Sequence, residues 1–176
     1  MRYLFALSIL FGVAACRGNV ETRVSSAGEA KIAGLIYQLP EKSDQEKADN
    51  LNARRLLVAA LAQRDIRRAD TAPVLLQITL SQRAADLGLK KGEGDKATVI
   101  AAPKEKKPFQ SCKDTEYRLG IRLSKISDGS LIYAGDAAEY HCKATFSEAL
   151  PAMIDAIISD MGGPRGDKTL SRRGKE

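Results

Sequence analysis

The segment 116–142 constrains the fold of this chain most strongly, because its pattern is that of a β-hairpin. From Tyr117 to Leu123, apolar side chains alternate with polar or small ones, which is the two-residue period of a strand with one buried face. Asp128-Gly129 then provides a turn, since glycine readily adopts the positive φ of tight hairpin turns. With these two residues as the loop, Tyr117 is expected to face Tyr140.

Two cysteines, Cys112 and Cys142, lie at the open end of this hairpin. In the expected register Cys142 lies opposite Thr115, a short step from Cys112. The first sixteen residues, described below, indicate export to an oxidising compartment, where such a pair is more often bridged than free. Closing the loop stabilises the fold by about 3–4 kcal/mol in the loop-entropy model. There is no Cys-x-x-Cys motif, and His141 points away from its neighbour Cys142 on a strand. We therefore expect a structural disulfide rather than a catalytic or redox thiol.

The remaining apolar pattern predicts two helices and two further strands. A capping box opens each helix, formed by Ser43 with Glu46 and by Thr145 with Glu148. In chain order the expected elements are strand 31–39, helix 43–64, strand 74–83, hairpin 116–142 and helix 146–161. They predict a single α+β domain over residues 31–163. Its antiparallel sheet of about four strands carries two helices packed on one face, in the order β-α-β-(loop)-β-β-α.

Residues 84–115 interrupt this pattern with glycines, prolines and seven lysines. We expect a long lysine-rich loop in which only residues 97–102 are ordered, as a short strand or covered edge. Lys104, Lys106 and Lys107 could contact an anionic surface such as lipid, lipopolysaccharide or an acidic partner, at about 1 kcal/mol per lysine. The alternative interpretation is a mobile, solubilising loop.

The first sixteen residues have the layout of a secretory signal peptide. Arg2 precedes thirteen uncharged residues, too few for a membrane-spanning helix, which needs about 20. The sequence Val13-Ala14-Ala15-Cys16 resembles the lipobox of bacterial lipoproteins, in which Leu is more usual than Val. The resemblance implies removal of residues 1–15, a diacylglycerol thioether on Cys16 and acylation of its amino group. An ordinary signal peptide with a coincidental cysteine is the alternative.

The same resemblance implies a location. Arg17 stands where Asp would retain a lipoprotein in the inner membrane, so we expect an outer-membrane anchor facing the periplasm. Residues 16–30 are small and polar and are expected to form a lipidated tether. Residues 164–176 lack an apolar pattern and are expected to form a disordered basic tail.

Residues 122–135, RLSKISDGSLIYAG, join an apolar strand, an Asp-Gly turn and an apolar-aromatic return. This hairpin is similar to one found in small periplasmic domains of envelope lipoproteins. Those domains are related to the amino-terminal domain of TolB, the curli-secretion lipoprotein and the penicillin-binding-protein activators. The resemblance implies a small α+β domain and no catalytic residue.

The sequence offers no pattern of a known catalytic, cofactor or nucleic-acid site. The net charge of +6 is spread along the chain, and no aromatic residue interleaves with the arginines at 64–68. His141 is the only histidine and has no metal-ligand spacing. There is no glycine-rich phosphate loop and no Gly-x-Ser-x-Gly motif. We therefore expect no enzyme, no cofactor, no metal and no nucleic-acid partner.

These features favour a non-enzymatic, lipid-anchored accessory or scaffold protein in envelope assembly or transport, with an envelope protein or glycan as partner. The first alternative is a module that binds a small molecule, lipid or glycan between sheet and helices, with the lysine loop as lid. The second is a hydrolase, which would need a nucleophile, base and orienting group brought together by the fold. The sequence does not predict an oligomeric state.

Intact-mass spectrometry of membrane-extracted protein tests the anchor and the disulfide together. We expect the mature chain to begin at an acylated Cys16, and to lack free thiols at Cys112 and Cys142. A chain that keeps Met1 and titrates three thiols would contradict both expectations.

Overall fold

The computed structural model describes residues 19–29, 32–41, 46–92, 98–106 and 110–174. Most of them build one seven-stranded sheet, in the order β3-β2-β4-β7-β8-β1-β9. Its strands are β1 (Asn19–Gly28), β2 (Ile36–Gln38), β3 (Arg67–Arg68), β4 (Val74–Ala84), β7 (Thr115–Lys125), β8 (Leu131–His141) and β9 (Gly166–Arg173). β2 pairs in parallel with β3 and β4, and the other neighbouring strands pair antiparallel.

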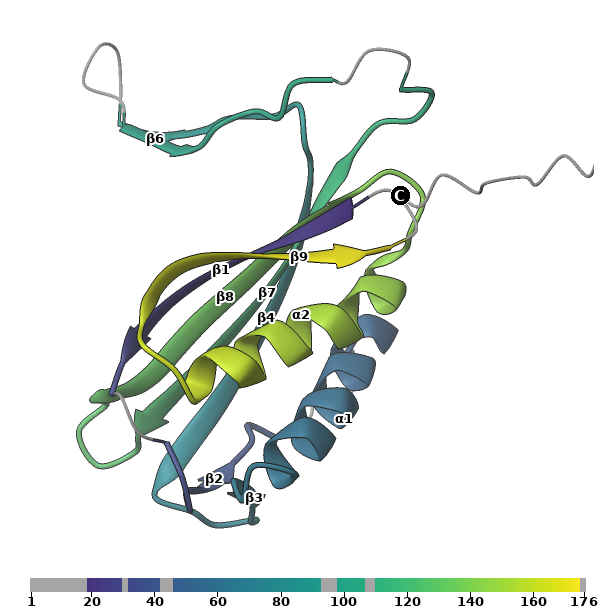
Figure 1. Cartoon of the computed structure of the whole chain (residues 1–176). Coiled ribbons are helices and arrows are strands. Elements are labelled where there is room, and N and C mark those ends of the chain that lie inside the picture. Colours follow the sequence, from purple (N-terminus) through teal and green to yellow (C-terminus); the bar gives the residue numbers. More distant parts are fainter. Residues whose placement is uncertain (1–18, 30–31, 42–45, 93–97, 107–109, 175–176) are drawn as a thin grey trace, which may run out of the picture.

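Two helices cover one face of this sheet, α1 (Ala48–Ala62) and α2 (Phe146–Met161) (Figure 1). The opposite face carries no helix in the part of the chain that the structure describes, and we call it the open face. β5 (Leu89–Lys91) and β6 (Thr98–Ala101) form a separate two-stranded sheet that extends from one end of the main sheet (Figure 1). We call this extension the arm, meaning the described residues 85–92 and 98–104.

The expected sheet of about four antiparallel strands is wrong. The main sheet has seven strands and is mixed, because the connection through α1 brings β2 and β4 side by side in parallel. The expected order also omits β1, β3, β5 and β9, whereas β6 lies within the short ordered stretch expected at 97–102.

β1 lies in the segment expected to be a tether, and β9 lies in the segment expected to be a disordered tail. Over the residues of these two strands, both expectations are wrong. Along β1 the buried side chains are Val20, Thr22 and Val24, only two of them apolar. β9 pairs with β1 over eight positions and turns Lys168 and Arg172 toward the helix-covered face. Because neither strand has a run of alternating apolar residues, hydrophobic periodicity could not detect them.

Polar contacts replace apolar packing along β9. Lys168 forms an ion pair with Asp160 of α2, and Arg172 Nη2 donates to Glu139 Oε2 of β8 at 2.7 Å. Asp160 also accepts from the Tyr133 hydroxyl at 3.0 Å. Asp160 and Glu139 are both buried, so these two cations satisfy charges that burial would otherwise penalise.

Three of the expected elements match the structure closely, whereas two are shorter than expected. β4 and the hairpin strands lie where predicted, and α2 begins with the predicted capping box of Thr145 and Glu148. α1 begins only at Ala48, with Lys47 as a cap that makes no side-chain hydrogen bond. Ser43, the expected cap, lies outside the described residues. The strand expected at 31–39 is reduced to β2.

The hairpin register differs from the expected one by a single residue. Tyr117 pairs with Glu139 rather than with Tyr140. Asp128 and Gly129 do lie in the turn, where Gly129 has a φ of +71°. However, Lys125 N donates to the carbonyl of Ser130, so the loop is longer than two residues. A register shift after Leu123 then sets the pairing of the rest of the hairpin.

The core lies between the sheet and the two helices. Most of its largest fully buried side chains come from α1, α2 and the three central strands, and Tyr37 of β2 and Ile66 add to them. Those from the helices and central strands are Leu57, Leu61, Leu76, Leu119, Leu123, Tyr133, Leu150, Met153, Ile154 and Ile157. The broad apolar stripe of α2 therefore packs where the sequence predicts, against one face of the central hairpin.

Truncation distinguishes a structural β9 from a disordered tail. We expect a chain that stops after Gly163 to lose about 3 kcal/mol or more of unfolding free energy, because Glu139 and Asp160 stay buried without their cations. Urea unfolding followed by circular dichroism measures the loss. A chain that stops after Gly174 keeps β9 and is the control, and equal midpoints for the two truncations would contradict the structural role.

Candidate functional site

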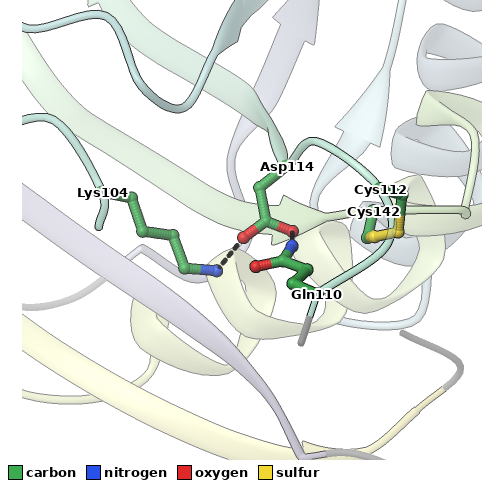
Figure 2. Close-up of a disulfide and its surroundings, with 5 residues drawn as sticks. All are labelled: Lys104, Gln110, Cys112, Asp114 and Cys142. Carbon is green, nitrogen blue, oxygen red and sulfur yellow. Dashed lines mark hydrogen bonds and ion pairs between the residues drawn. A yellow bond between two sulfur atoms is a disulfide. The ribbon is translucent and has the colours of Figure 1, made fainter. Parts of the chain in front are cut away.

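The disulfide fixes the end of the sheet where β7 begins and β8 ends (Figure 2). Cys112 and Cys142 are joined as expected, with their Cα atoms 5.6 Å apart. Thr115 pairs with His141 rather than with Cys142, in line with the one-residue change of register. The bridge thus clamps the open end of the central hairpin. Cys16, the predicted lipidation site, lies outside the described residues.

The lysines expected to contact an anionic surface lie next to this clamp. Lys104 Nζ is 2.5 Å from Asp114 Oδ2, and Gln110 Nε2 donates to the other carboxylate oxygen at 2.8 Å (Figure 2). Lys106 is exposed, and Lys107 lies outside the described residues. Lys104 is therefore held by an internal carboxylate, whereas Lys106 is directed to solvent.

On the open face, three arginines surround the buried carboxylate of Glu116. Glu116 is 2% exposed, and it accepts hydrogen bonds from Arg23 Nη2 at 2.5 Å and from Arg83 Nε. Arg118 Nη2 lies 3.5 Å from the same carboxylate. Burial alone raises the pKa of Glu116, but the hydrogen bonds from Arg23 and Arg83 outweigh it and hold the pKa below its ordinary value. One carboxylate cannot neutralise three guanidinium groups, so this part of the open face stays positive.

Tyr140 extends this cluster toward the arm. The guanidinium of Arg23 lies 4.5 Å from the centre of the Tyr140 ring, and the Lys104 ammonium lies 4.6 Å from it. Both are cation–π contacts, which favour a fixed position of the ring. The base of the arm is thereby attached to the open face at the disulfide-clamped end.

A groove of about 470 Å³ lies between the open face and the arm. Arg23 and Arg118 contribute positive charge to its wall, while Asp136 and Asp167 contribute negative charge. Ile100 of β6 lines the groove from the side of the arm. The groove thus combines charges of both signs with one apolar wall, which suits a polar ligand or a protein or glycan segment better than a purely apolar one.

A second polar cluster lies on the helix-covered face around Glu139, which is fully buried. It accepts hydrogen bonds from Thr22 Oγ1 at 2.5 Å and from Arg172, and its Oε2 lies 2.6 Å from His141 Nε2. Burial raises the pKa of Glu139, but its contacts with His141, Thr22 and Arg172 outweigh burial, so the pKa lies below the ordinary value. The cluster ties β1 and β9 to β8.

This arrangement differs from that of a hydrolase. His141 is buried beside a carboxylate and stacks on Tyr117, with ring centres 5.8 Å apart. The nearby hydroxyl of Thr22 donates to Glu139 rather than to the imidazole, so the three side chains are not in the hydroxyl–imidazole–carboxylate order of a catalytic triad. Thr22, Glu139 and His141 are all nearly inaccessible to solvent. The cluster therefore stabilises the sheet and offers no reactive hydroxyl to a substrate.

The pocket expected between sheet and helices has a counterpart, but its position and lining differ from the expectation. A hollow of about 680 Å³ lies between the beginning of α1, β4 and the first residue of α2, Phe146. Its polar wall includes Glu41, Glu46 and Asp49. None of the described residues of the lysine-rich segment lines it, so they do not form its lid. The arm instead lies beside the groove on the open face.

The arm itself exposes large apolar side chains. Leu87, Leu89, Val99 and Ile100 are between 48% and 64% exposed. They account for half of the eight large hydrophobic residues that are exposed in the described chain. Such clustering marks an interaction surface more often than isolated exposed residues do.

Sequence reasoning missed Arg23, Glu116, Tyr140 and the strand β5 of the arm, although it placed a short ordered stretch at 97–102, where β6 lies. β5 gave little signal because it has three residues and lies between glycines at 88 and 92. The charged cluster gave no signal, because its members come from strands that are distant in sequence.

No family model and no curated protein matches this sequence. Several solved structures share features of the fold. A PDZ domain protein from Parabacteroides distasonis matches with a TM-score of 0.58 and 10% identity, over 87% of this chain and 38% of that protein. This chain thus spans well under half of that protein. At this identity the likeness concerns the fold alone.

Two further matches have lower scores. The PelC dodecamer from Paraburkholderia phytofirmans has a TM-score of 0.47 and 11% identity, over 81% of this chain and 99% of that one. A candidate lipoprotein from Caulobacter crescentus has a TM-score of 0.39 and 13% identity, over 73% of this chain and 88% of that one. No helix among the described residues is long and apolar enough to cross a membrane.

The lowered pKa of Glu139 predicts an acid-dependent loss of stability. A carboxylate whose pKa is lower in the folded than in the unfolded chain stabilises the fold above its unfolded pKa, and this contribution disappears as the pH falls through the folded pKa. We expect Glu139→Gln to lower the unfolding free energy at pH 7 by about 3 kcal/mol, and by clearly less at pH 3. Guanidinium unfolding at both pH values measures this. Glu105→Gln, at an exposed position, is the control, and an equal loss from Glu139→Gln at the two pH values would contradict the assignment.

Proposed function

We propose that this protein is a lipid-anchored, non-enzymatic component of the periplasmic side of the outer membrane. In this proposal it is an accessory or scaffold in envelope assembly or transport, and it binds its partner through the open face and the groove beside the arm. The observation that carries the proposal is the position at which β1 begins. Asn19 is the first residue of β1, and only Arg17 and Gly18 separate it from Cys16.

An acylated Cys16 would hold one particular end of the sheet at the bilayer. Three residue steps span at most about 11 Å, so Asn19 would lie close to the lipid headgroups. Because β1 runs antiparallel to β8, this is also the end that holds the disulfide. The groove and the cluster around Glu116 begin at the same end, so a partner bound there would be held near the membrane surface.

Site-specific crosslinking tests which face binds the partner. We expect a photoreactive amino acid at Thr169, on the open-face side of β9, to form adducts with an envelope protein or glycan in intact cells. The same group at Arg55, on the exposed surface of α1, should form none and serves as the control. Adducts are detected by mobility shift and identified by mass spectrometry. Adducts from Arg55 alone, or from neither position, would argue against the open face.

The alternative function is binding of a small molecule, lipid or glycan in the groove, favoured by the two arginines in its wall. In that case thermal unfolding should shift upward with lipopolysaccharide, peptidoglycan fragments or phospholipid. Arg118→Ala should remove the shift, because Arg118 lines the groove and makes only the longest of the contacts to Glu116. A chain that none of these ligands stabilises would leave the accessory role as the better proposal.

A further inference from the structure

The arm exposes four large apolar side chains beside lysines, and it lies at the end of the sheet that the anchor would hold. We propose that the arm inserts its apolar side chains into the anionic interface of the bilayer to which Cys16 is anchored. This inference rests on the proposed anchor, because the anchor brings this end of the sheet to the bilayer. It adds a second membrane contact made by the folded protein itself.

The position of the arm follows from contacts at its base. Ala85 N donates to the carbonyl of Asp114 at 2.9 Å, and Lys104 N donates to the carbonyl of Ala85 at 2.7 Å. Asp114 is two residues from the disulfide at Cys112. The arm therefore leaves the sheet at its clamped end, where β1 also begins (Figure 1).

The exposed apolar side chains come from both strands of the arm. Leu89 belongs to β5, and Val99 and Ile100 belong to β6. A two-stranded element of this kind can enter a bilayer interface with the apolar side chains of both strands among the lipid chains.

The charges near these residues fit an anionic interface. Lys90 and Lys91 are exposed beside the apolar positions, and Lys106 is exposed just beyond β6. Lysine can keep its ammonium among headgroups while its carbon chain lies along apolar surface. Over residues 85–106, five lysines stand against the four acids Asp86, Glu93, Asp95 and Glu105, so the net positive charge is small. The apolar side chains are thus expected to supply most of the affinity, and the lysines a preference for anionic lipid.

The test uses the absence of tryptophan from the sequence. The protein is exported behind an ordinary cleavable signal peptide, with Cys16→Ser, so that it carries no lipid and keeps its disulfide. Val99→Trp places a single fluorophore in the arm. Ile126→Trp places one in the β7–β8 turn, at a site of similar exposure, 50% against 54%. Both variants are mixed with vesicles of phosphatidylethanolamine and phosphatidylglycerol at three to one.

We expect the emission of the Val99→Trp variant to shift to the blue and to be quenched by brominated acyl chains, while the Ile126→Trp variant changes little. In sedimentation assays, Leu89→Ser combined with Val99→Ser should lower vesicle binding about tenfold or more. The matched pair Ile36→Ser with Ile126→Ser, exposed apolar residues outside the arm, should leave binding unchanged. Phosphatidylcholine vesicles should bind more weakly than anionic ones.

Equal binding by the two serine pairs, or no blue shift at position 99, would overturn the inference. A different result would assign the arm to a protein partner instead of the bilayer. In that case the Cys16→Ser protein would bind no vesicles, and the Leu89→Ser, Val99→Ser variant would lose a crosslink to an envelope protein that the unmodified arm forms in cells. The anchor is tested separately, by whether the wild-type chain fractionates with the outer membrane. A soluble wild-type chain would refute the anchor, whereas the vesicle assay with Cys16→Ser reports on the arm alone.

Discussion

The pairing of β7 with β8 is the constraint on which the rest of the sheet depends. β4 pairs with β7 and β1 pairs with β8, so an error in the hairpin register would be passed to every outer strand. A shift by one residue would turn either Leu119 of β7 or Tyr133 of β8 from the core to the open face, depending on which strand moved. The longer turn and the register shift after Leu123 fix the pairing at one end, and the disulfide holds the other.

The sequence predicted the elements whose apolar residues recur regularly, and it missed those held by polar contacts. α2, β4 and the two hairpin strands bury a continuous apolar face, so their periods are visible in the residues. β9 is held by backbone pairing and by Lys168 and Arg172, which resemble the residues of a solvated tail. The hairpin register was wrong because an Asp-Gly pair indicates a turn without determining its length.

The candidate site was less predictable than the fold. The cysteine pair was visible because two cysteines at the open end of a hairpin suggest one bridge. The cluster around Glu116 joins Arg23, Arg83 and Arg118 from three different strands, and only the completed sheet order places them together. In this cluster the buried carboxylate of Glu116 fixes the positions of several arginines but does not cancel their total positive charge. The same surface is therefore well ordered and still able to attract a negatively charged group.

The place of β1 between β8 and β9 has a consequence for the timing of biogenesis. Arg23 pairs with Ala138 on one side and with Thr169 on the other, so in the proposed export β1 would leave the translocation channel long before either neighbour. Until then the segment next to Cys16 has no sheet to join. Enzymes that process and acylate a leader could act on an extended chain at that stage. Completion of the sheet would then enclose β1 between β8 and β9 after these enzymes had acted. Maturation of the leader would therefore precede folding of the sheet.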